Sequence, residues 1–149
     1  MVTVITKSFD QLNTTELYEI WRARFEVFVM EQQCFYLDPD MIDYDCWHLF
    51  VWGDDGHLCA YARSFIDRDN HDVWHVGRML TTRRRAGIGT QVMLAAISLA
   101  SEHHAKLIEI DAQTHAIGFY ERLGFKVTSG EFDEAGIRHV KMELTLVAD

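Results

Sequence analysis

The stretch Arg84-Arg85-Ala86-Gly87-Ile88-Gly89-Thr90 is a basic, glycine-containing turn between two regular patterns. Alternating apolar residues over Val73–Leu80 predict a strand that leads into it, and the apolar spacing after Gly87 predicts a helix that leaves it. The first N–H groups of a helix have no intrahelical partner, and the helix dipole adds partial positive charge at that end. Because glycine has no Cβ, an anion can approach the backbone closely at Gly87 and Gly89. The turn therefore predicts a site for the phosphate groups of a cofactor.

Two common classes of phosphate-binding protein do not fit this turn. A Walker-type loop requires a lysine and then a serine or threonine after its second glycine, and Ile88-Gly89-Thr90 lacks that lysine. A dinucleotide-binding fold places its glycine motif near the N-terminus and alternates strands and helices from there. Here an antiparallel series of strands comes first. The remaining interpretation is a pyrophosphate site after the fourth strand of a mixed sheet.

Composition and charge set further bounds. The chain has 149 residues, of which 48% are hydrophobic, and this predicts a single domain over residues 1–149. The net charge of −9 argues against nucleic-acid binding, which requires a broad basic surface, and is compatible with a cationic acceptor. The sequence has neither an apolar run of membrane-spanning length nor a signal pattern, so we expect a soluble, cytoplasmic protein. Three cysteines without metal-type spacing are expected to be reduced, and no metal site is expected.

Periodicity and turn residues predict the other elements. Asn13 begins a capping-box pattern, and an apolar stripe follows it at helical spacing to about Met30. The stripe consists of Leu17, Trp21, Phe25 and Phe28, together with Ile20 and Val29. Arg22, Arg24 and Glu26 fall off it. The other predicted strands are Val2–Ser8, Trp47–Trp52, His57–Ile66, Lys106–Ala112, Phe125–Val127 and Ile137–Leu146, and the other predicted helices are Gly87–His103 and Ala116–Leu123.

The segment Glu31–Asp45 is predicted to be an irregular loop. It carries carboxylates at Asp38, Asp40, Asp43 and Asp45. A calcium-binding loop fits poorly, because Pro39 and Ile42 replace polar and glycine positions and the closing glutamate is absent. The two interpretations left open are a loop that recognises an acceptor and a plain solvated loop.

Two motifs together resemble one acyltransferase superfamily. Arg84–Gly89 is similar to the Gln/Arg-x-x-Gly-x-Gly/Ala signature of the GCN5-related N-acetyltransferases (GNAT). Gln113–Phe125 resembles the second motif of that superfamily, in which a helix and a Phe-Tyr-x-x-x-Gly-Phe tail close the cofactor site. The similarity extends over Leu17–Met142 to the ElaA-like branch. Its further matching pieces are Arg24, Val27–Val29, Glu31-Gln32, Cys34, Tyr36, His48, Ala60–Arg63, Gly77-Arg78, Ala112-Gln113 and Asp133–Met142.

The resemblance implies the fold and the donor. The fold would be α/β (α+β), with a mixed central sheet of about six to seven strands, an antiparallel first half and helices on both faces. The donor would be acetyl-coenzyme A, with its pyrophosphate on the turn and its pantetheine arm in a gap between the fourth and fifth strands. The implied cofactor-binding residues are Met79, Leu80, Thr81, Arg84, Arg85, Ala86, Gly87, Ile88, Gly89, Thr90, Gln113 and Phe119.

The catalytic assignment begins with the leaving thiolate, which requires a proton. Tyr120 in the second motif is the predicted proton donor. An acceptor ammonium must also lose a proton, and Glu31 is preferred as base over His48 and Asp111. His139 and Arg78 could face the cleft, and Cys34 as an acetyl-carrying nucleophile is disfavoured because the superfamily transfers directly.

Three functional hypotheses follow from this resemblance. The first is acetyl transfer to a primary amine, of a small molecule or a peptide, through a ternary complex. The second is a catalytically idle protein that binds an acyl-coenzyme A as a sensor or interaction partner. The third is acyl-homoserine-lactone synthesis, ranked last because the chain is short and lacks an obvious tunnel for a long acyl group. A homodimer is a further expectation, since the family commonly dimerises.

Overall fold

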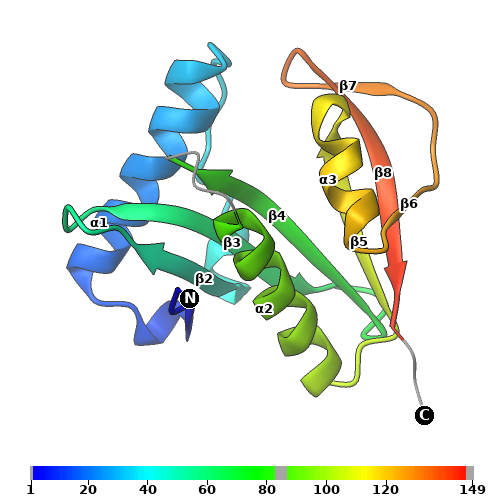
Figure 1. Ribbon diagram of the computed structural model, residues 1–149, viewed down its shortest axis with the longest axis horizontal. Coiled ribbons are helices and arrows are strands. Elements are labelled where there is room, and N and C mark those ends of the chain that lie inside the picture. Colours follow the sequence, from blue (N-terminus) through cyan, green and yellow to red (C-terminus); the bar gives the residue numbers. More distant parts are fainter. Residues whose placement is uncertain (1, 83–86, 147–149) are drawn as a thin grey trace.

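The computed structural model describes residues 2–82 and 87–146, which form helices on both faces of one mixed sheet (Figure 1). The strands are β1 (Ile5–Ser8), β2 (Trp47–Trp52), β3 (Leu58–Ile66), β4 (Val73–Thr81), β5 (Leu107–Gln113), β6 (Lys126–Val127), β7 (Phe132–Glu134) and β8 (Ile137–Thr145). The α-helices are α1 (Thr14–Arg24), α2 (Ile88–Glu102) and α3 (Ile117–Arg122), and the shorter helical segments are η1 (Phe9–Gln11), η2 (Phe25–Glu31), η3 (Ile42–Asp45) and η4 (Thr114–Ala116).

The sheet confirms the predicted fold class. Its order is β1-β2-β3-β4-β5-β8-β6, with β7 paired to β8. The pairs β1–β2, β2–β3 and β3–β4 are antiparallel. Strand β5 is parallel to β4 because α2 crosses between them. The described residues form eight strands, more than the six to seven expected. The addition is β7, which folds back on β8 around the predicted turn at Asp133–Gly136.

Alternation along the strands separates two apolar clusters. On β2, Leu49 and Val51 point to the face that α2 covers, and Phe50 points to the face that α1 covers. The α2 cluster also takes in Ile108 of β5 and Phe125 beyond α3, and it is the larger of the two. Consequently α2 and α3 share one face of the sheet and α1 lies on the other (Figure 1).

Helix α1 begins where it was predicted to begin but presents a different face to the sheet. The Glu16 N–H donates to Asn13 Oδ1 at 2.7 Å, and the Asn13 N–H donates to Glu16 Oε1 at 2.9 Å, so the capping box is confirmed. The predicted apolar stripe is confirmed only in part: Ile20 and Val29 are buried, whereas Trp21 is 41% exposed and Phe25 is 53% exposed. The fully buried residues of α1 are Ile20, Ala23 and Arg24. Carboxylates from the following loop neutralise Arg24, which allows this charged face to be buried.

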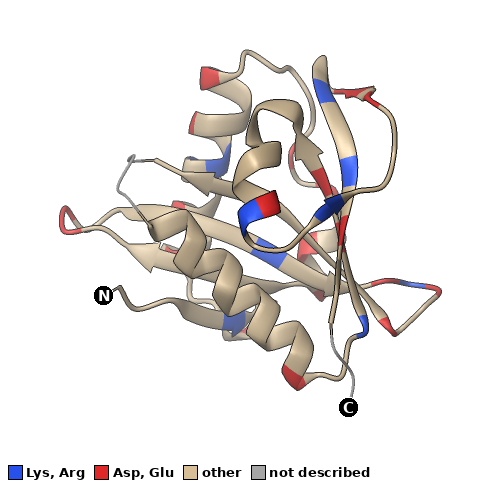
Figure 2. Cartoon of the chain, turned by 45° about the vertical axis from the view of Figure 1, so that its right-hand side comes forward, with Lys and Arg blue, Asp and Glu red and all other residues tan. Residues whose placement is uncertain are grey.

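The charges of the chain are distributed over many elements. Figure 2 shows Lys and Arg positions interspersed with Asp and Glu positions along the strands and loops. Helix α2 carries a single charged residue, Glu102, at its C-terminal end. Among the described residues, no helix combines the length and apolar character that crossing a bilayer requires.

Candidate active site

A cleft opens where β4 and β5 separate. These parallel strands pair at Val73, Trp74 and His75 of β4, and beyond His75 they run apart (Figure 1). Strand β5 instead stays paired with β8 along its length, from Leu107 to Gln113. The gap that the resemblance implied between the fourth and fifth strands is therefore present, and the cleft has a volume of about 1290 Å³.

Most of the residues predicted for the site line this cleft. They are Glu31, Met79, Leu80, Thr81, Gly87, Gly89, Thr90, Gln113, Phe119 and Tyr120. Ile88 does not line it, since its side chain is buried in the core at the start of α2 and can contribute its backbone alone. Arg84, Arg85 and Ala86 lie outside the described residues.

Two glycines shape the start of α2 for different reasons. Gly87 is the N-cap and has a φ of +89°, a left-handed conformation that side chains other than glycine adopt at a cost. A Cβ there would meet no atom of the described residues within 4 Å, so they leave the space above Gly87 open. At Gly89 a Cβ would lie 3.2 Å from Met79 Cε and 3.6 Å from Phe119 Cζ. The first turn of α2 thus offers N–H groups and open space beside the cleft, as an anion site requires.

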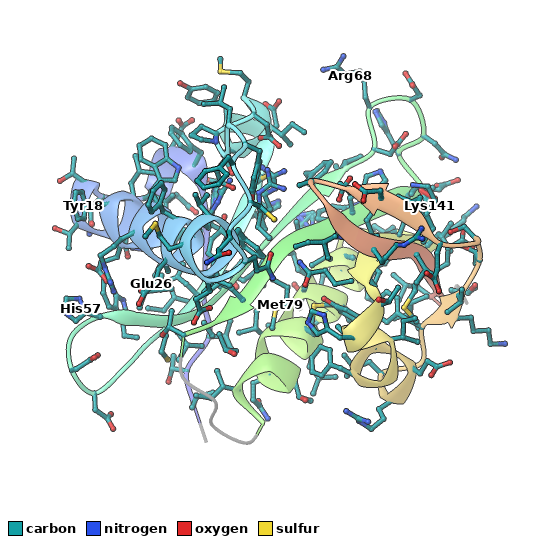
Figure 3. All side chains as sticks on the ribbon, turned by 90° about the horizontal axis from the view of Figure 1, so that it is seen from above. Tyr18, Glu26, His57, Arg68, Met79 and Lys141 are labelled. Carbon is teal, nitrogen blue, oxygen red and sulfur yellow. The ribbon has the colours of Figure 1, made fainter. Side chains whose placement is uncertain are left out.

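Strand β4 has a bulge beside the cleft. Between the pairs Tyr61–Leu80 and Arg63–Gly77 it has one residue more than β3, and Arg78 there has a φ of +51°. A bulge disrupts the ladder of backbone hydrogen bonds and re-aims the neighbouring side chains. Figure 3 shows Met79, the next residue, at the centre of the molecule between the sheet and α2. At the bulge, therefore, the backbone N–H and C=O groups of β4 next to the cleft are not all hydrogen-bonded to β3.

Tyr120 is packed by its ring, while its hydroxyl has no hydrogen-bond partner among the described residues. The ring makes edge contacts with Phe119 and Phe125, at centroid distances of 5.0 and 5.8 Å. Burial raises the pKa of Tyr120 to about 12, so the phenol stays protonated at neutral pH. Such a group can donate a proton within the cleft.

Gln113 is joined across the cleft to Gln32. Gln32 Nε2 donates to Gln113 Oε1 at 3.1 Å, and Gln113 Nε2 donates to Gln32 Oε1 at 3.2 Å. Close by, the thiol of Cys34 donates to the carbonyl of Ala135 at 3.0 Å. The segment after η2 is thereby attached to both the end of β5 and the β7–β8 turn. The sequence indicated Gln113 as a cofactor residue but did not indicate its partner.

Glu31 reaches the cleft because the helix after α1 is widened. Segment η2 is π-helical, and the Gln32 N–H donates to the carbonyl of Val27 at 3.3 Å, five residues back. Segments of this kind occur frequently at functional sites. Val27, Phe28 and Glu31 line the cleft, whereas Met30 between them is exposed on the outer side.

The loop between η2 and β2 is held by a buried ion-pair network. Arg24 donates to Asp38 Oδ2 at 2.8 Å and to Asp43 Oδ1 at 2.6 Å. The other two arginines come from the sheet: Arg63 donates to Asp40 at 2.6 Å and to Asp43 at 3.1 Å, and Arg78 donates to Asp38 at 2.9 Å. Three guanidinium groups therefore balance three carboxylates, and the plain solvated loop is excluded.

The network keeps Asp40 and Asp43 ionised. The hydrogen bond from Arg63 lowers the pKa of Asp40 to about 2. Burial raises the pKa of Asp43, but hydrogen bonds and charge from Arg24 and Arg63 outweigh it, and the net pKa is lowered. Within the described ranges, no group of three His, Cys, Asp or Glu side chains could hold a metal ion. The sequence showed these aspartates but not the arginines that bind them.

The alternative catalytic residues have other partners. His48 is 1% exposed and lies outside the cleft, where it contacts the Tyr61 hydroxyl at 2.6 Å and the Asp43 carbonyl at 3.0 Å. Burial lowers the pKa of His48. Asp111 lines the cleft but accepts a hydrogen bond from Lys141 Nζ at 3.1 Å. His139 also lines the cleft and stacks on Phe132 with ring centroids 5.9 Å apart.

Comparison with known proteins agrees with this geometry. Residues 21–146 match the family model described as an acetyltransferase (GNAT) domain. Protein ElaA of Escherichia coli is 31% identical over 138 residues, which cover 89% of this chain and 90% of ElaA. Its crystal structure has a TM-score of 0.88 at 30% identity and covers 97% of this chain and 99% of that one.

Two further structures share the fold. A crystal structure of an acyl-CoA N-acyltransferase from Pseudomonas aeruginosa has a TM-score of 0.87 at 31% identity and covers 97% of this chain and 100% of that chain. A Bacillus subtilis acetyltransferase in complex with CoA has a TM-score of 0.69 at 18% identity and covers 99% of this chain and 100% of that one, a likeness of fold alone. The cleft and the comparisons together define an acyltransferase. The chain belongs to the GNAT acetyltransferase family and is similar to ElaA.

Proposed function

We propose that the protein transfers an acetyl group from acetyl-coenzyme A directly to a primary amine within a ternary complex. The observation that carries the proposal is the cleft between β4 and β5, which has the N-terminus of α2 at its edge and the Tyr120 phenol in its lining. A Bacillus subtilis acetyltransferase of the same fold, solved in complex with CoA, supports a ligand of this type. The space above Gly87 fits a pyrophosphate, because no atom of the described residues lies within 4 Å of a Cβ placed there.

The donor contacts follow from the elements at the cleft. Backbone N–H groups of Gly87 to Thr90 would hold the pyrophosphate at the positive end of the α2 dipole. Main-chain groups of Met79, Leu80 and Thr81 would contact the pantetheine arm and polarise the thioester carbonyl, because β5 no longer pairs with β4 at these residues. Phe119 and Gln113 lie in the same lining. Bound acetyl-coenzyme A supplies an acetyl group on a thioester.

Two residues would move the protons. Glu31, directly or through a water, would accept a proton from the acceptor ammonium, so that the neutral amine can attack the carbonyl carbon. As the carbon–sulfur bond breaks, Tyr120 would donate its proton to the sulfur. The raised pKa of Tyr120 keeps that proton in place until the thiolate forms. The products are an N-acetyl amide and coenzyme A.

The acceptor would be an amine on a small molecule or a peptide. Among the carboxylates in the cleft lining, Asp40 and Asp111 form ion pairs with Arg63 and Lys141. Glu31 and Glu109 line the cleft without an ion-pair partner among the described residues. Together with the net charge of −9, this favours a cationic acceptor over an acidic one.

A Tyr120→Phe variant tests the assignment of the acid. We expect kcat to fall about 10²- to 10⁴-fold with an amine substrate, the usual contribution of general acid catalysis. Stability should change little, because the hydroxyl has no hydrogen-bond partner among the described residues. Coenzyme A release is measured with a thiol reagent across pH, and Tyr44→Phe, at a 60% exposed tyrosine outside the cleft lining, is the matched control. Unchanged turnover by Tyr120→Phe at every pH would falsify the assignment.

The same assay separates the enzyme from an idle sensor. Calorimetry would measure acetyl-coenzyme A binding, and a panel of mono-, di- and polyamines, amino sugars and peptides would measure coenzyme A release. Micromolar binding with turnover of at least one amine is the expected result. Tight binding with no turnover across the panel would favour a sensor, and absence of binding would reject both.

A further inference from the structure

A stripe of large apolar side chains lies on the solvent side of α1 and η2. The stripe consists of Tyr18, Trp21, Phe25 and Met30, which are 69%, 41%, 53% and 60% exposed. The steps of three and four residues follow an α-helix, and the step of five from Phe25 to Met30 matches the wider π-helical turn of η2. Tyr18 and Glu26 project from the outer side of this helix in Figure 3. The π-helical segment thus keeps Met30 in line with the stripe.

The stripe forms a shallow apolar hollow that is distinct from the cleft. Its volume is about 560 Å³, and it is lined by the stripe together with Arg22, Glu26, Asp38 and Pro39. None of these residues belongs to the described lining of the cleft between β4 and β5. Large contiguous exposed apolar patches on soluble proteins commonly mark interaction sites.

The charges at the rim restrict what can cover this hollow. Arg22 is ion-paired with Glu19 at 3.4 Å and with Glu26 at 3.2 Å, so the rim is nearly neutral. A membrane surface with anionic lipids attracts clusters of Lys and Arg, and this rim has a single paired arginine. A second copy of a chain with a net charge of −9 is repelled wherever acidic charge is exposed. Self-association therefore requires a face with balanced charges, and this face has them.

We propose that this face binds the same face of a second copy of the chain, with the two α1 helices antiparallel about a two-fold axis. In a two-fold contact each residue meets its complement on the partner. An axis beside position 24 pairs position 22 with position 26 and position 18 with position 30. Arg22 then meets the partner's Glu26, Tyr18 meets the partner's Met30, and Trp21 and Phe25 of both copies pack at the centre.

The exposed apolar area is sufficient for such a contact. A buried aromatic side chain contributes roughly 150–250 Å². At their exposed fractions, the four residues of the stripe supply on the order of 500 Å² of the roughly 800 Å² that a standard interface buries on each partner. Leu37 and Met41, two residues either side of Pro39 in the chain, are 82% and 71% exposed and add to this surface.

A charge-swap experiment on the full-length chain tests the contact. Sedimentation and light scattering should show a dimer for the unmodified protein at micromolar concentration. Arg22→Glu and Glu26→Arg should each weaken self-association at least about tenfold, because each creates two like-charge pairs. An equimolar mixture of the two variants should form a heterodimer, and the double variant R22E/E26R should dimerise again, because both restore opposite charges across the axis.

Controls and contrary outcomes complete the test. Arg68→Glu changes an exposed charge on the loop between β3 and β4, far from Tyr18 in Figure 3, and should leave the dimer intact. Circular dichroism verifies that each variant is folded. A monomeric unmodified protein overturns the proposal, and so do single variants that stay dimeric or a mixture that stays monomeric. Binding of the monomer to phosphatidylglycerol vesicles or to an apolar helical peptide would assign the face to another occupant.

Discussion

Arg24 has no exposed surface, and it is the one charged residue of α1 that is completely buried. Its guanidinium binds Asp38 and Asp43 of the following loop, and it lies 5.8 Å from the centroid of the Tyr61 ring. These contacts raise the pKa of Arg24 despite its burial, so the charge persists. A buried charge is tolerated only when it is paired and hydrogen-bonded. This one residue therefore connects α1, the loop and the sheet.

Replacing Arg24 with methionine tests that connection. We expect Arg24→Met to lower the free energy of unfolding by about 3–5 kcal/mol, because two buried carboxylates lose a partner. The matched control is Arg138→Met, whose side chain is 66% exposed and whose ion pair with Glu131 spans 3.9 Å; it should change stability by less than about 0.5 kcal/mol. Urea unfolding measures both. A loss below about 1 kcal/mol for Arg24→Met would show that the network does not hold the loop.

At the scale of elements, the site depends on where α2 begins and on where β4 and η2 depart from regular strand and α-helix geometry. Helix α2 begins at a left-handed glycine, β4 bulges at Arg78, and η2 widens to a π-helix. Each deviation changes which groups face the cleft: N–H groups at the start of α2, main-chain groups of β4, and the Glu31 carboxylate at the end of η2. Regular elements alone would have left these groups pointing elsewhere.

The start of α2 yields a prediction about Gly87. A Cβ there meets no atom of the described residues within 4 Å, so the effect of a substitution comes from the φ of +89°. Gly87→Ala should lower the free energy of unfolding by about 1–2 kcal/mol. Gly87→Asn should lower it less, because asparagine tolerates left-handed φ and caps helices well. Under the proposed function, calorimetric affinity for coenzyme A should follow the order Gly, Asn, Ala. Equal stability of the Ala and Asn variants would contradict the conformational argument.

At the scale of the whole molecule, the cleft exists because β5 pairs with β8 over a longer stretch than with β4. Three residue pairs join β4 to β5, whereas seven join β5 to β8. The sheet is thus continuous at one end and divided at the other. The pairs Gln32–Gln113 and Cys34–Ala135 join the two sides again across the open end.

Hydrogen exchange tests this arrangement together with the cofactor proposal. Saturating coenzyme A should slow exchange of the amides in Gly77–Thr81 and in the first turn of α2, because the ligand would cover both. A hundredfold excess over Kd stabilises the folded state by about 2.7 kcal/mol, enough to detect. The hairpin end around His57, at the edge of the molecule away from Met79 in Figure 3, serves as the internal control and should be unchanged. Protection confined to other strands would contradict the placement of the donor.

Local patterns were sufficient to predict much of the fold. The capping box at Asn13, the alternation in β2 to β4 and the glycine turn before α2 all act over a few residues. Such signals depend on helix and strand geometry alone, so they can be read without knowing what packs where. Most of the residues predicted to line the cleft also do so, because the two motifs that suggested them lie at the ends of β4 and β5.

The sequence by itself determined most of the elements, their order and the residues at the start of α2. Only the tertiary structure decided that Arg24 is buried, that Trp21 and Phe25 are exposed, and that Gln32 binds Gln113 from 81 residues away. The physical reason is that apolar periodicity marks one face of a helix that could be buried. It does not reveal that a face carrying Arg24 can be buried once carboxylates neutralise the charge. Which face of α1 packs on the sheet depends on the carboxylates of Asp38 and Asp43 in the loop after η2. The spacing of residues within α1 cannot predict those contacts.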